Sequence, residues 1–156
     1  MTSPIAIRPA TAADIAAVVE LVRATLAEFG LTFGTGSATD DQLRDLPGSY
    51  ADHGGGFWVA AAGDRVLGTC GVFPVAPATF ELRKMYLHAD ARGLGLGRRL
   101  LEVAIGWCRD RGAAWLVLDT IEDMTRAIAF YEAHGFVRDD HQIRGARCTR
   151  GYARRL

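Results

Sequence analysis

A glycine-rich segment flanked by arginines is the part of this sequence best suited to binding chemistry. Residues 92–99 read Arg-Gly-Leu-Gly-Leu-Gly-Arg-Arg. Glycine has no Cβ, so the backbone N–H groups of such a segment can turn toward a ligand, and a helix that begins there adds its partial positive charge. Guanidinium groups match the geometry of phosphate oxygens. The glycine segment, residues 92–99, therefore predicts a site for a phosphate-type anion.

Two common phosphate-binding patterns do not fit the glycine segment. A dinucleotide-binding fold would place a third glycine where this chain has Leu100. A P-loop would need a lysine followed by serine or threonine, and no such pair follows these glycines. A tight turn without a ligand is the alternative for an isolated Gly-x-Gly pattern. The position of the segment, between a strand that ends at Leu87 and an arginine-rich helix start, favours the anion site.

The elements that position the glycine segment follow from the hydrophobic pattern. Alternation at Ile5 and Ile7 predicts an opening strand, and apolar residues at helical spacing predict a helix from Thr11–Asp14 to about Phe29. Next we expect a loop over residues 30–37 and a short helix, capped by Thr39 or Asp40, that ends before Pro47. Three strands are predicted as an antiparallel meander, over residues 57–62, 66–75 and 79–87.

The C-terminal half alternates helices with strands. The glycine segment leads into an amphipathic helix that ends at Gly112, and an apolar strand follows over residues 115–118. A helix is predicted from about Met124 to His134, and a strand begins at Phe136. A strand, a crossover helix and a second strand imply a parallel pair. We therefore predict an α/β (mixed α+β) fold in a single domain over residues 1–156, with a mostly antiparallel sheet, one parallel pair and about four flanking helices.

Composition excludes several classes of protein. Lys+Arg and Asp+Glu both total 18, so no overall field attracts nucleic acid or anionic lipid. The three cysteines lie far apart and the four histidines have no metal-ligand spacing, so neither a disulfide framework nor a metal is expected. No signal-peptide pattern and no membrane-length apolar run is present in the sequence. We expect a cytoplasmic protein without a nucleic-acid or membrane partner.

Two motifs together resemble the GNAT superfamily of N-acetyltransferases. Arg92-x-x-Gly95-x-Gly97 is similar to the pyrophosphate motif of that family, and the run Phe-Tyr-Glu-Ala-His-Gly-Phe at residues 130–136 is similar to its second signature. The specific part of the resemblance covers residues 80–136. One departure is Met124, which stands where many members have an asparagine that contacts the cofactor, so no such contact is expected of Met124.

The resemblance implies acetyl-CoA as co-substrate. Family members hold its pantetheine arm like an extra strand in the gap where two parallel strands diverge, here the strand ending at Leu87 and the strand at residues 115–118. Backbone amides of the glycine segment would hold the pyrophosphate. The cofactor-binding residues implied in this way are Met85, Tyr86, Leu87, Arg92, Gly93, Leu94, Gly95, Leu96, Gly97, Arg98 and Arg99.

The resemblance also implies three catalytic groups for direct attack of an amine on the thioester. The Leu87 N–H would stabilise the oxyanion. Tyr131 would be the general acid, since a phenol with a pKa near 10 can donate to a thiolate whose acid has a pKa of about 8.5. The alternative for Tyr131 is an aromatic core residue. Glu81 would be the general base, directly or through a water relay, with a structural or substrate-holding carboxylate as the alternative. Glu81 is expected to share strand parity with Met85 and Leu87.

The acceptor is less defined than the donor. Phe29, Phe33 and Tyr50 are predicted to wall an apolar pocket, with ordinary packing as the alternative. Arginines crowd the C-terminal tail, where they fit a solvated strand or a site for an acidic substrate; they are Arg144, Arg147, Arg150, Arg154 and Arg155. A small-molecule amine is the favoured acceptor. A protein or peptide acceptor, or a non-catalytic acyl-CoA sensor, are the alternatives, and the family resemblance implies that a homodimer is possible.

Overall fold

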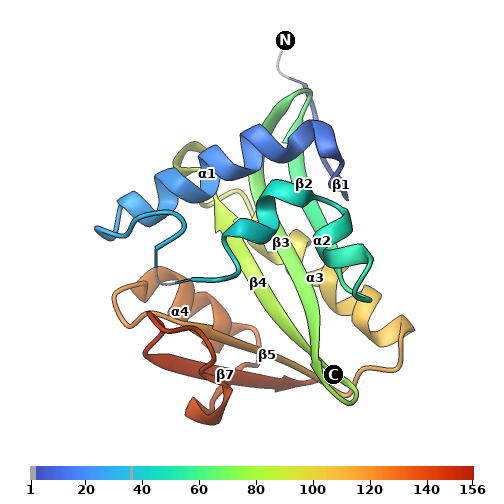
Figure 1. The fold of residues 1–156 in the computed structure, drawn as a ribbon, viewed down its shortest axis with the longest axis vertical. Coiled ribbons are helices and arrows are strands. Elements are labelled where there is room, and N and C mark those ends of the chain that lie inside the picture. The colour runs from blue at the N-terminus through green and yellow to red at the C-terminus, as the bar shows by residue number, and fades with distance from the viewer. Residues whose placement is uncertain (1–2, 36) are drawn as a thin grey trace.

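One mixed sheet organises the part of the chain that the computed structural model describes, residues 3–35 and 37–156 (Figure 1). Its seven strands lie in the order β1-β2-β3-β4-β5-β7-β6. The strands are β1 (Ile5–Pro9), β2 (Gly56–Ala62), β3 (Arg65–Ala76), β4 (Thr79–Leu87), β5 (Trp115–Thr120), β6 (Val137–Arg138) and β7 (Arg150–Arg155). Neighbouring strands are antiparallel except β4 and β5, which are parallel. The predicted fold class, with one parallel pair, is confirmed.

Helices cover both faces of the sheet and build two apolar clusters. The helices are α1 (Ile15–Ala27), α2 (Gly48–Ala51), α3 (Leu96–Asp110) and α4 (Thr125–Ala133). Apolar residues of α1 and α2 form the first cluster, on the face turned to the viewer in Figure 1. Those of α3 and α4 form the second cluster on the opposite face. No helix of the described residues has the length and hydrophobicity needed to cross a membrane.

The short helix predicted before Pro47 is a 3₁₀ turn in the structure, and a second short helix follows Pro47. A 3₁₀ turn covers Asp41–Asp45 and α2 begins after Pro47. Proline has no N–H donor, so it cannot continue the turn before it, but its carbonyl can start the next one. The Pro47 carbonyl accepts the N–H groups of Tyr50 and Ala51 at 3.1 and 2.9 Å. The sequence pattern missed α2 because four residues are too few to show periodicity.

A β-bulge divides β4 at Lys84. Lys84 has φ of 53°, and two β4 residues, Lys84 and Met85, oppose one residue of β3. Such a bulge shifts the alternation of side chains by one. Met85 and Leu87 accordingly pack on the second cluster, whereas Arg83, which bonds to Glu81, lies over the Phe73 ring of the first cluster. The expectation that Glu81 shares parity with Met85 and Leu87 is therefore wrong.

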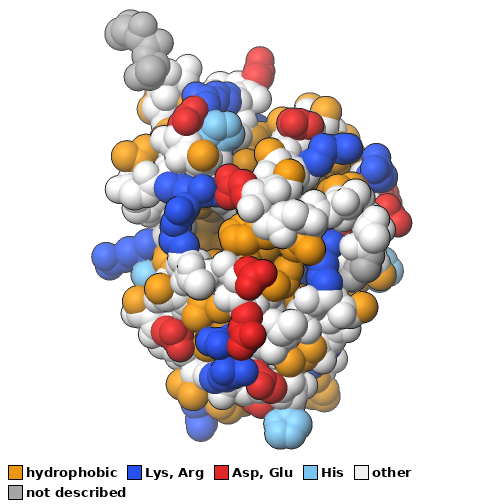
Figure 2. Space-filling model, turned by 90° about the vertical axis from the view of Figure 1, so that its left-hand side faces the viewer, with side chains coloured by type: hydrophobic (Ala, Val, Ile, Leu, Met, Phe, Trp, Pro, Cys, Tyr) orange, Lys and Arg blue, Asp and Glu red, His pale blue; other side chains and the backbone are white. Residues whose placement is uncertain are grey.

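The parallel pair is short. Strands β4 and β5 pair over residues 79–81 and 115–117, and the pairing ends at Glu81 opposite Val117. Beyond this point the edge of β4 that faces β5 has no strand beside it within the described residues. The predicted divergence of the two strands is confirmed, and Glu81 lies at its vertex. In Figure 2, which views the side of the molecule at the left of Figure 1, hydrophobic side chains gather at the centre with charged ones around them.

Candidate active site

The glycine segment has the backbone geometry of an anion site. Gly93 and Gly95 have φ of 80° and 78°, a conformation that side chains disfavour, and a Cβ at either would meet nothing within 4 Å. Gly95 is the N-cap of α3, and no side chain caps this helix. The first-turn N–H groups of an uncapped helix are available to an anion. Gly97 has a different role, since a Cβ there would lie 3.3 Å from the Phe130 ring and would push α4 away.

The three arginines of the glycine segment each have a protein partner. Arg92 forms a forked contact with both carboxylate oxygens of Glu28, at 3.1 and 2.8 Å, and so links the segment to the end of α1. Arg98 pairs with Glu102 at 2.9 Å, one turn further along α3. Arg99 donates to the Ile5 carbonyl at 3.5 Å. The groups that the segment offers to an anion are therefore its backbone N–H groups, with Arg98 and Arg99 beside them.

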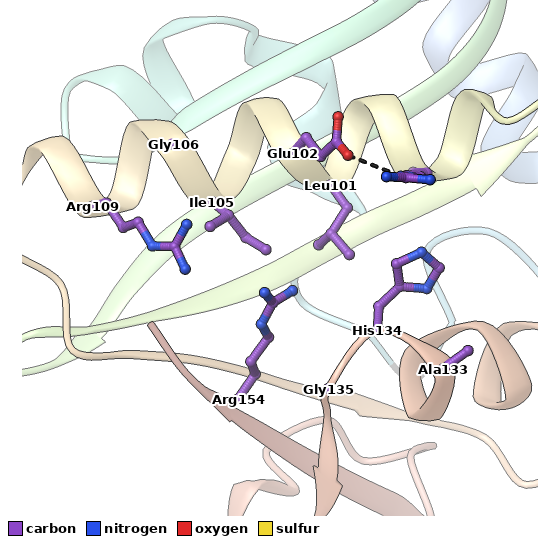
Figure 3. Close-up of a pocket in the computed structure, with 10 residues that line it drawn as sticks. Leu101, Glu102, Ile105, Gly106, Arg109, Ala133, His134, Gly135 and Arg154 are labelled. Atoms are coloured by element: carbon purple, nitrogen blue, oxygen red, sulfur yellow. Dashed lines mark hydrogen bonds and ion pairs between the residues drawn. The ribbon is translucent and has the colours of Figure 1, made fainter.

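A groove of about 670 Å³ runs between α3 and α4 (Figure 3). It begins at Arg98, near the end of the glycine segment, and continues along α3 to Arg109. Leu101 and Ile105 form its floor, while His134, from the end of α4, and Arg154, from β7, project toward it in Figure 3. The sequence pattern did not predict this groove. Its lining combines α3 and the end of α4 with Arg154 of β7, and only the tertiary structure brings these segments together.

Tyr131 lies inside a group of aromatic rings. Its ring centroid is 5.8 Å from that of Phe130, 5.7 Å from Phe136 and 6.5 Å from Tyr152. The residue is 7% exposed, and burial raises the pKa of its phenol above the ordinary value, with Tyr86 and Cys70 adding to the effect. Tyr131 therefore keeps its proton at neutral pH. This position is compatible both with the predicted acid and with an aromatic core residue.

Glu81 is a buried carboxylate held by two guanidinium groups. Its side chain is 5% exposed, and Oε1 accepts a hydrogen bond from Arg83 Nε at 2.6 Å. Oε2 has a longer contact, 3.5 Å, with Arg144 Nη1. Arg83 also donates to Gln42 Oε1 at 3.1 Å. This position is compatible with both roles expected of Glu81, the general base and the substrate-holding carboxylate.

Asp40 forms a second buried ionic cluster next to the bulge. It is fully buried and pairs with Lys84 and, at 3.2 Å, with Arg147, while the Gly34 N–H donates to it at 2.7 Å. Burial would raise the pKa of Asp40, but the bonds with Lys84, Gly34 and Arg147 outweigh burial, and the pKa lies below its ordinary value. Asp40 stands at the N-cap of the 3₁₀ turn, but its side chain does not cap it. The predicted capping role is therefore wrong.

The tail arginines do not form one cluster. Arg144 and Arg147 reach Glu81 and Asp40. Arg150 pairs with Glu122 at 3.1 Å, and Arg154 borders the groove between α3 and α4, whereas Arg155 is exposed. The loop that carries Arg144 and Arg147 is held by Asp119 of β5, whose Oδ2 accepts the N–H groups of Arg144 and Gly145 at 2.7 Å each. Tertiary structure thus separates the five arginines into four regions.

The structure assigns ordinary packing to Tyr50, one of the three aromatic residues predicted to wall a pocket. Tyr50 is fully buried, with its ring 5.1 Å from Phe57 and 5.8 Å from Phe73, so it is a core residue and not a pocket wall. Phe33 lies between the guanidinium groups of Arg23 and Arg44, at 5.6 and 5.2 Å from its ring centroid. Phe29 packs against the first cluster. The described residues contain no group of three or more His, Cys, Asp or Glu side chains that could hold a metal ion.

Comparisons with known proteins agree on one family. The family model described as the acetyltransferase (GNAT) family matches residues 19–136. An Escherichia coli K12 protein called uncharacterized N-acetyltransferase YjgM is 32% identical over 145 residues, which cover 90% of this chain and 86% of that protein. An acetyltransferase of the GNAT family from Staphylococcus aureus Mu50 superposes with a TM-score of 0.89 and 24% identity, covering 98% of this chain and 99% of that one. PaiA N-acetyltransferase from Thermoplasma acidophilum, in complex with coenzyme A, superposes with a TM-score of 0.78 and 18% identity over 98% and 99% of the two chains.

Proposed function

The chain belongs to the acetyltransferase (GNAT) family and is an acetyl-CoA-dependent N-acetyltransferase, and we propose that its acceptor is the primary amine of a small molecule. The acetyl-CoA donor site is supported by the combination of an uncapped α3 N-terminus with the divergence of β4 from β5, and an amine acceptor by the buried carboxylate of Glu81 at the vertex of that divergence. The first feature suits a pyrophosphate and the second leaves a strand edge for an extended arm. Coenzyme A has both parts. The relative from Thermoplasma acidophilum, which carries coenzyme A, has the same fold.

The donor site would extend along β4, through the glycine segment and into the groove. Backbone groups of Met85 and Leu87 would pair with the pantetheine arm at the unpaired edge of β4. Amides of the glycine segment would hold the pyrophosphate. The groove of Figure 3 begins at Arg98, where the pyrophosphate would lie, so it would take the nucleotide end, with Arg154 near the 3′-phosphate.

The transfer step would need three groups. The neutral amine attacks the thioester carbon, a C–N bond forms, and the charge on the carbonyl oxygen is stabilised by the Leu87 N–H. The C–S bond then breaks, and the departing thiolate takes the proton that Tyr131 donates. Tyr131 is reprotonated by the proton that the new amide nitrogen loses. The net products are an N-acetyl amine, free coenzyme A and the one proton that the ammonium lost before attack.

Glu81 would act where the ammonium arrives. It lies at the vertex between β4 and β5, on the face opposite Met85 and Leu87. Its carboxylate would hold the ammonium and accept its proton directly or through water. Glu81→Gln distinguishes base from binder: loss of a base lowers kcat most at neutral pH, whereas loss of a binder mainly raises KM for the amine.

The function is tested by incubating the enzyme with acetyl-CoA and a panel of small primary amines, and by measuring release of the coenzyme A thiol. We expect turnover on at least one small amine, above the rate of thioester hydrolysis without acceptor. Turnover confined to peptides or protein would replace the small-molecule acceptor with a macromolecular one. Acetyl-CoA binding with no turnover on any amine or peptide would identify a sensor and contradict the proposal.

A further inference from the structure

The two oxygens of Glu81 are not held equally. Oε1 is bound by Arg83 at 2.6 Å, and Arg83 is itself fixed by Gln42 and by the Phe73 ring, 4.3 Å from its guanidinium carbon. Oε2 has the 3.5 Å contact with Arg144, which lies at the limit of a hydrogen bond. An incoming ammonium can therefore bind Oε2 without disturbing the Arg83 pair.

Arg144 is the guanidinium in this region that is most available to a ligand. Its side chain is 38% exposed, compared with 13% for Arg83 and 14% for Arg147. Apart from the long contact with Glu81, its recorded bonds are to two neutral acceptors of Gln142, the backbone carbonyl at 3.2 Å and Oε1 at 3.1 Å. Displacing it from neutral acceptors costs little when the ligand offers a carboxylate.

The charges around Glu81 leave an excess of positive charge. Four cations share two carboxylates through recorded contacts, and these six residues are Arg83, Lys84, Arg144, Arg147, Asp40 and Glu81. A third carboxylate, Asp119, accepts the backbone N–H groups of Arg144 and Gly145. Even with Asp119 counted, positive charge exceeds negative charge in a largely buried region. A carboxylate on a ligand would therefore find a cationic partner here.

We propose that the acceptor is an α-amino acid, whose ammonium binds Glu81 Oε2 and whose carboxylate binds Arg144. This inference rests on the proposed acetyl transfer. Glu81 and Arg144 are in contact at 3.5 Å, so the two groups that they bind must be on neighbouring carbon atoms of one molecule. An α-amino acid meets this condition. A peptide N-terminus does not, because its first carbonyl is an amide with no charge for Arg144 to pair with.

The test compares matched acceptors that differ only in the carboxylate. The standard L-amino acids are assayed with acetyl-CoA beside their carboxamides and their decarboxylated amines. For the best amino acid, we expect kcat/KM to exceed that of its carboxamide by about 10- to 100-fold, as charge-assisted bonds imply. Equal or faster turnover of the carboxamides or of the decarboxylated amines would overturn the inference while leaving the acetyl transfer intact.

Substitutions of Arg144 test whether this residue causes the preference for an acceptor with a carboxylate. Arg144→Gln is expected to reduce the ratio of amino acid to carboxamide turnover to about one, and Arg144→Lys to an intermediate value because lysine keeps the charge but loses the fork. This ratio is measured within one preparation, so it is independent of the fraction that folds. Arg155→Gln, an exposed arginine on β7, is the matched control and should keep the wild-type ratio.

Binding separates this inference from the proposed function. Calorimetry of the wild-type enzyme with coenzyme A present should detect the amino acid, and Arg144→Gln should weaken its Kd by about 10-fold or more. If no amine is acetylated but this binding is observed, the acetyl transfer fails and the amino-acid site stands. If neither binding nor a carboxylate preference is found, the inference is rejected.

Discussion

At the scale of single residues, burial determines what Tyr131 can do. A phenol surrounded by Phe130, Phe136 and Tyr152 loses the solvation of its ionised form, and its pKa rises. A raised pKa keeps Tyr131 protonated through the alkaline range, as a proton donor must be. It also makes the phenol a weaker acid, so that donation to the thiolate depends on the basicity that the sulfur gains as the C–S bond breaks.

Tyr131→Phe is expected to lower kcat by about 10²- to 10⁴-fold and to change the Kd of acetyl-CoA little, since the ring packing is kept. Because the pKa of Tyr131 is raised, its ionisation should cause no fall of the wild-type kcat between pH 7 and about 10. The measurements are a kcat–pH profile and acetyl-CoA titration of both proteins. A variant with the wild-type rate would remove Tyr131 from the mechanism, whereas an alkaline limb below pH 10 that the variant lacks would contradict the raised pKa of Tyr131.

At the scale of elements, the proposed acceptor site at Glu81 and Arg144 depends on a loop whose position is fixed by a strand far from it in the sequence. The loop between β6 and β7 brings Arg144 and Arg147 to Glu81 and Asp40, and Asp119 of β5 holds this loop through two backbone N–H groups. On the donor side, α3 and α4 approach closely at Gly97, and the groove beside them is completed by Arg154 of β7. The loop before β7 would therefore serve the proposed acceptor, and Arg154 of β7 itself the proposed donor.

Asp119→Ala is expected to raise KM for the acceptor about 10-fold, because two N–H groups lose their acceptor and Arg144 loses its position. KM for acetyl-CoA should change less than about twofold, since the glycine segment lies elsewhere. Steady-state kinetics with each substrate varied, and hydrogen exchange at the amides of Arg144 and Gly145, give the readout. Asp123→Ala, an exposed residue of the following loop, is the control. A variant in which only KM for acetyl-CoA rises would refute this assignment.

Arg154→Gln is expected to raise KM for acetyl-CoA about 10-fold, because the groove would lose its contact with the 3′-phosphate. The same variant should leave KM for 3′-dephospho-acetyl-CoA near the wild-type value, since that donor lacks the 3′-phosphate that Arg154 would bind. The comparison of the two donors is made beside Arg155→Gln, whose exposed side chain does not border the groove. An equal loss with both donors would contradict a nucleotide site in the groove.

At the scale of the whole molecule, the Asp40 cluster joins three distant parts of the chain. It links the segment after α1, the bulge of β4 and the loop before β7 through buried contacts of Asp40 with Lys84 and Arg147. Removing one partner of a buried ion pair leaves an uncompensated charge, which typically costs about 3–5 kcal/mol. The cluster therefore contributes to stability as well as to the shape of the acceptor side.

Asp40→Asn is expected to lower the free energy of unfolding by about 3 kcal/mol at pH 7. The folded pKa of Asp40 lies below the unfolded value of about 3.9, so its contribution is present above pH 4 and is lost as pH falls through the folded pKa. Urea unfolding between pH 2.5 and 7 should show the difference between wild type and variant shrinking below pH 4. Asp41→Asn, on an exposed neighbour, should cost less than about 0.5 kcal/mol. A difference independent of pH would contradict this account.

The sequence by itself determined most of the elements, though not α2, together with the parallel pair, the glycine segment and the family. These follow from local features: hydrophobic period, glycines at a helix start and a motif around Tyr131. Tertiary structure decided the features that depend on residues far apart in the chain. The bulge at Lys84 reverses the parity that local alternation implies for Glu81. Packing made Tyr50 a core residue, and long-range pairing divided the tail arginines, so that Arg144 reached Glu81 from 63 positions away.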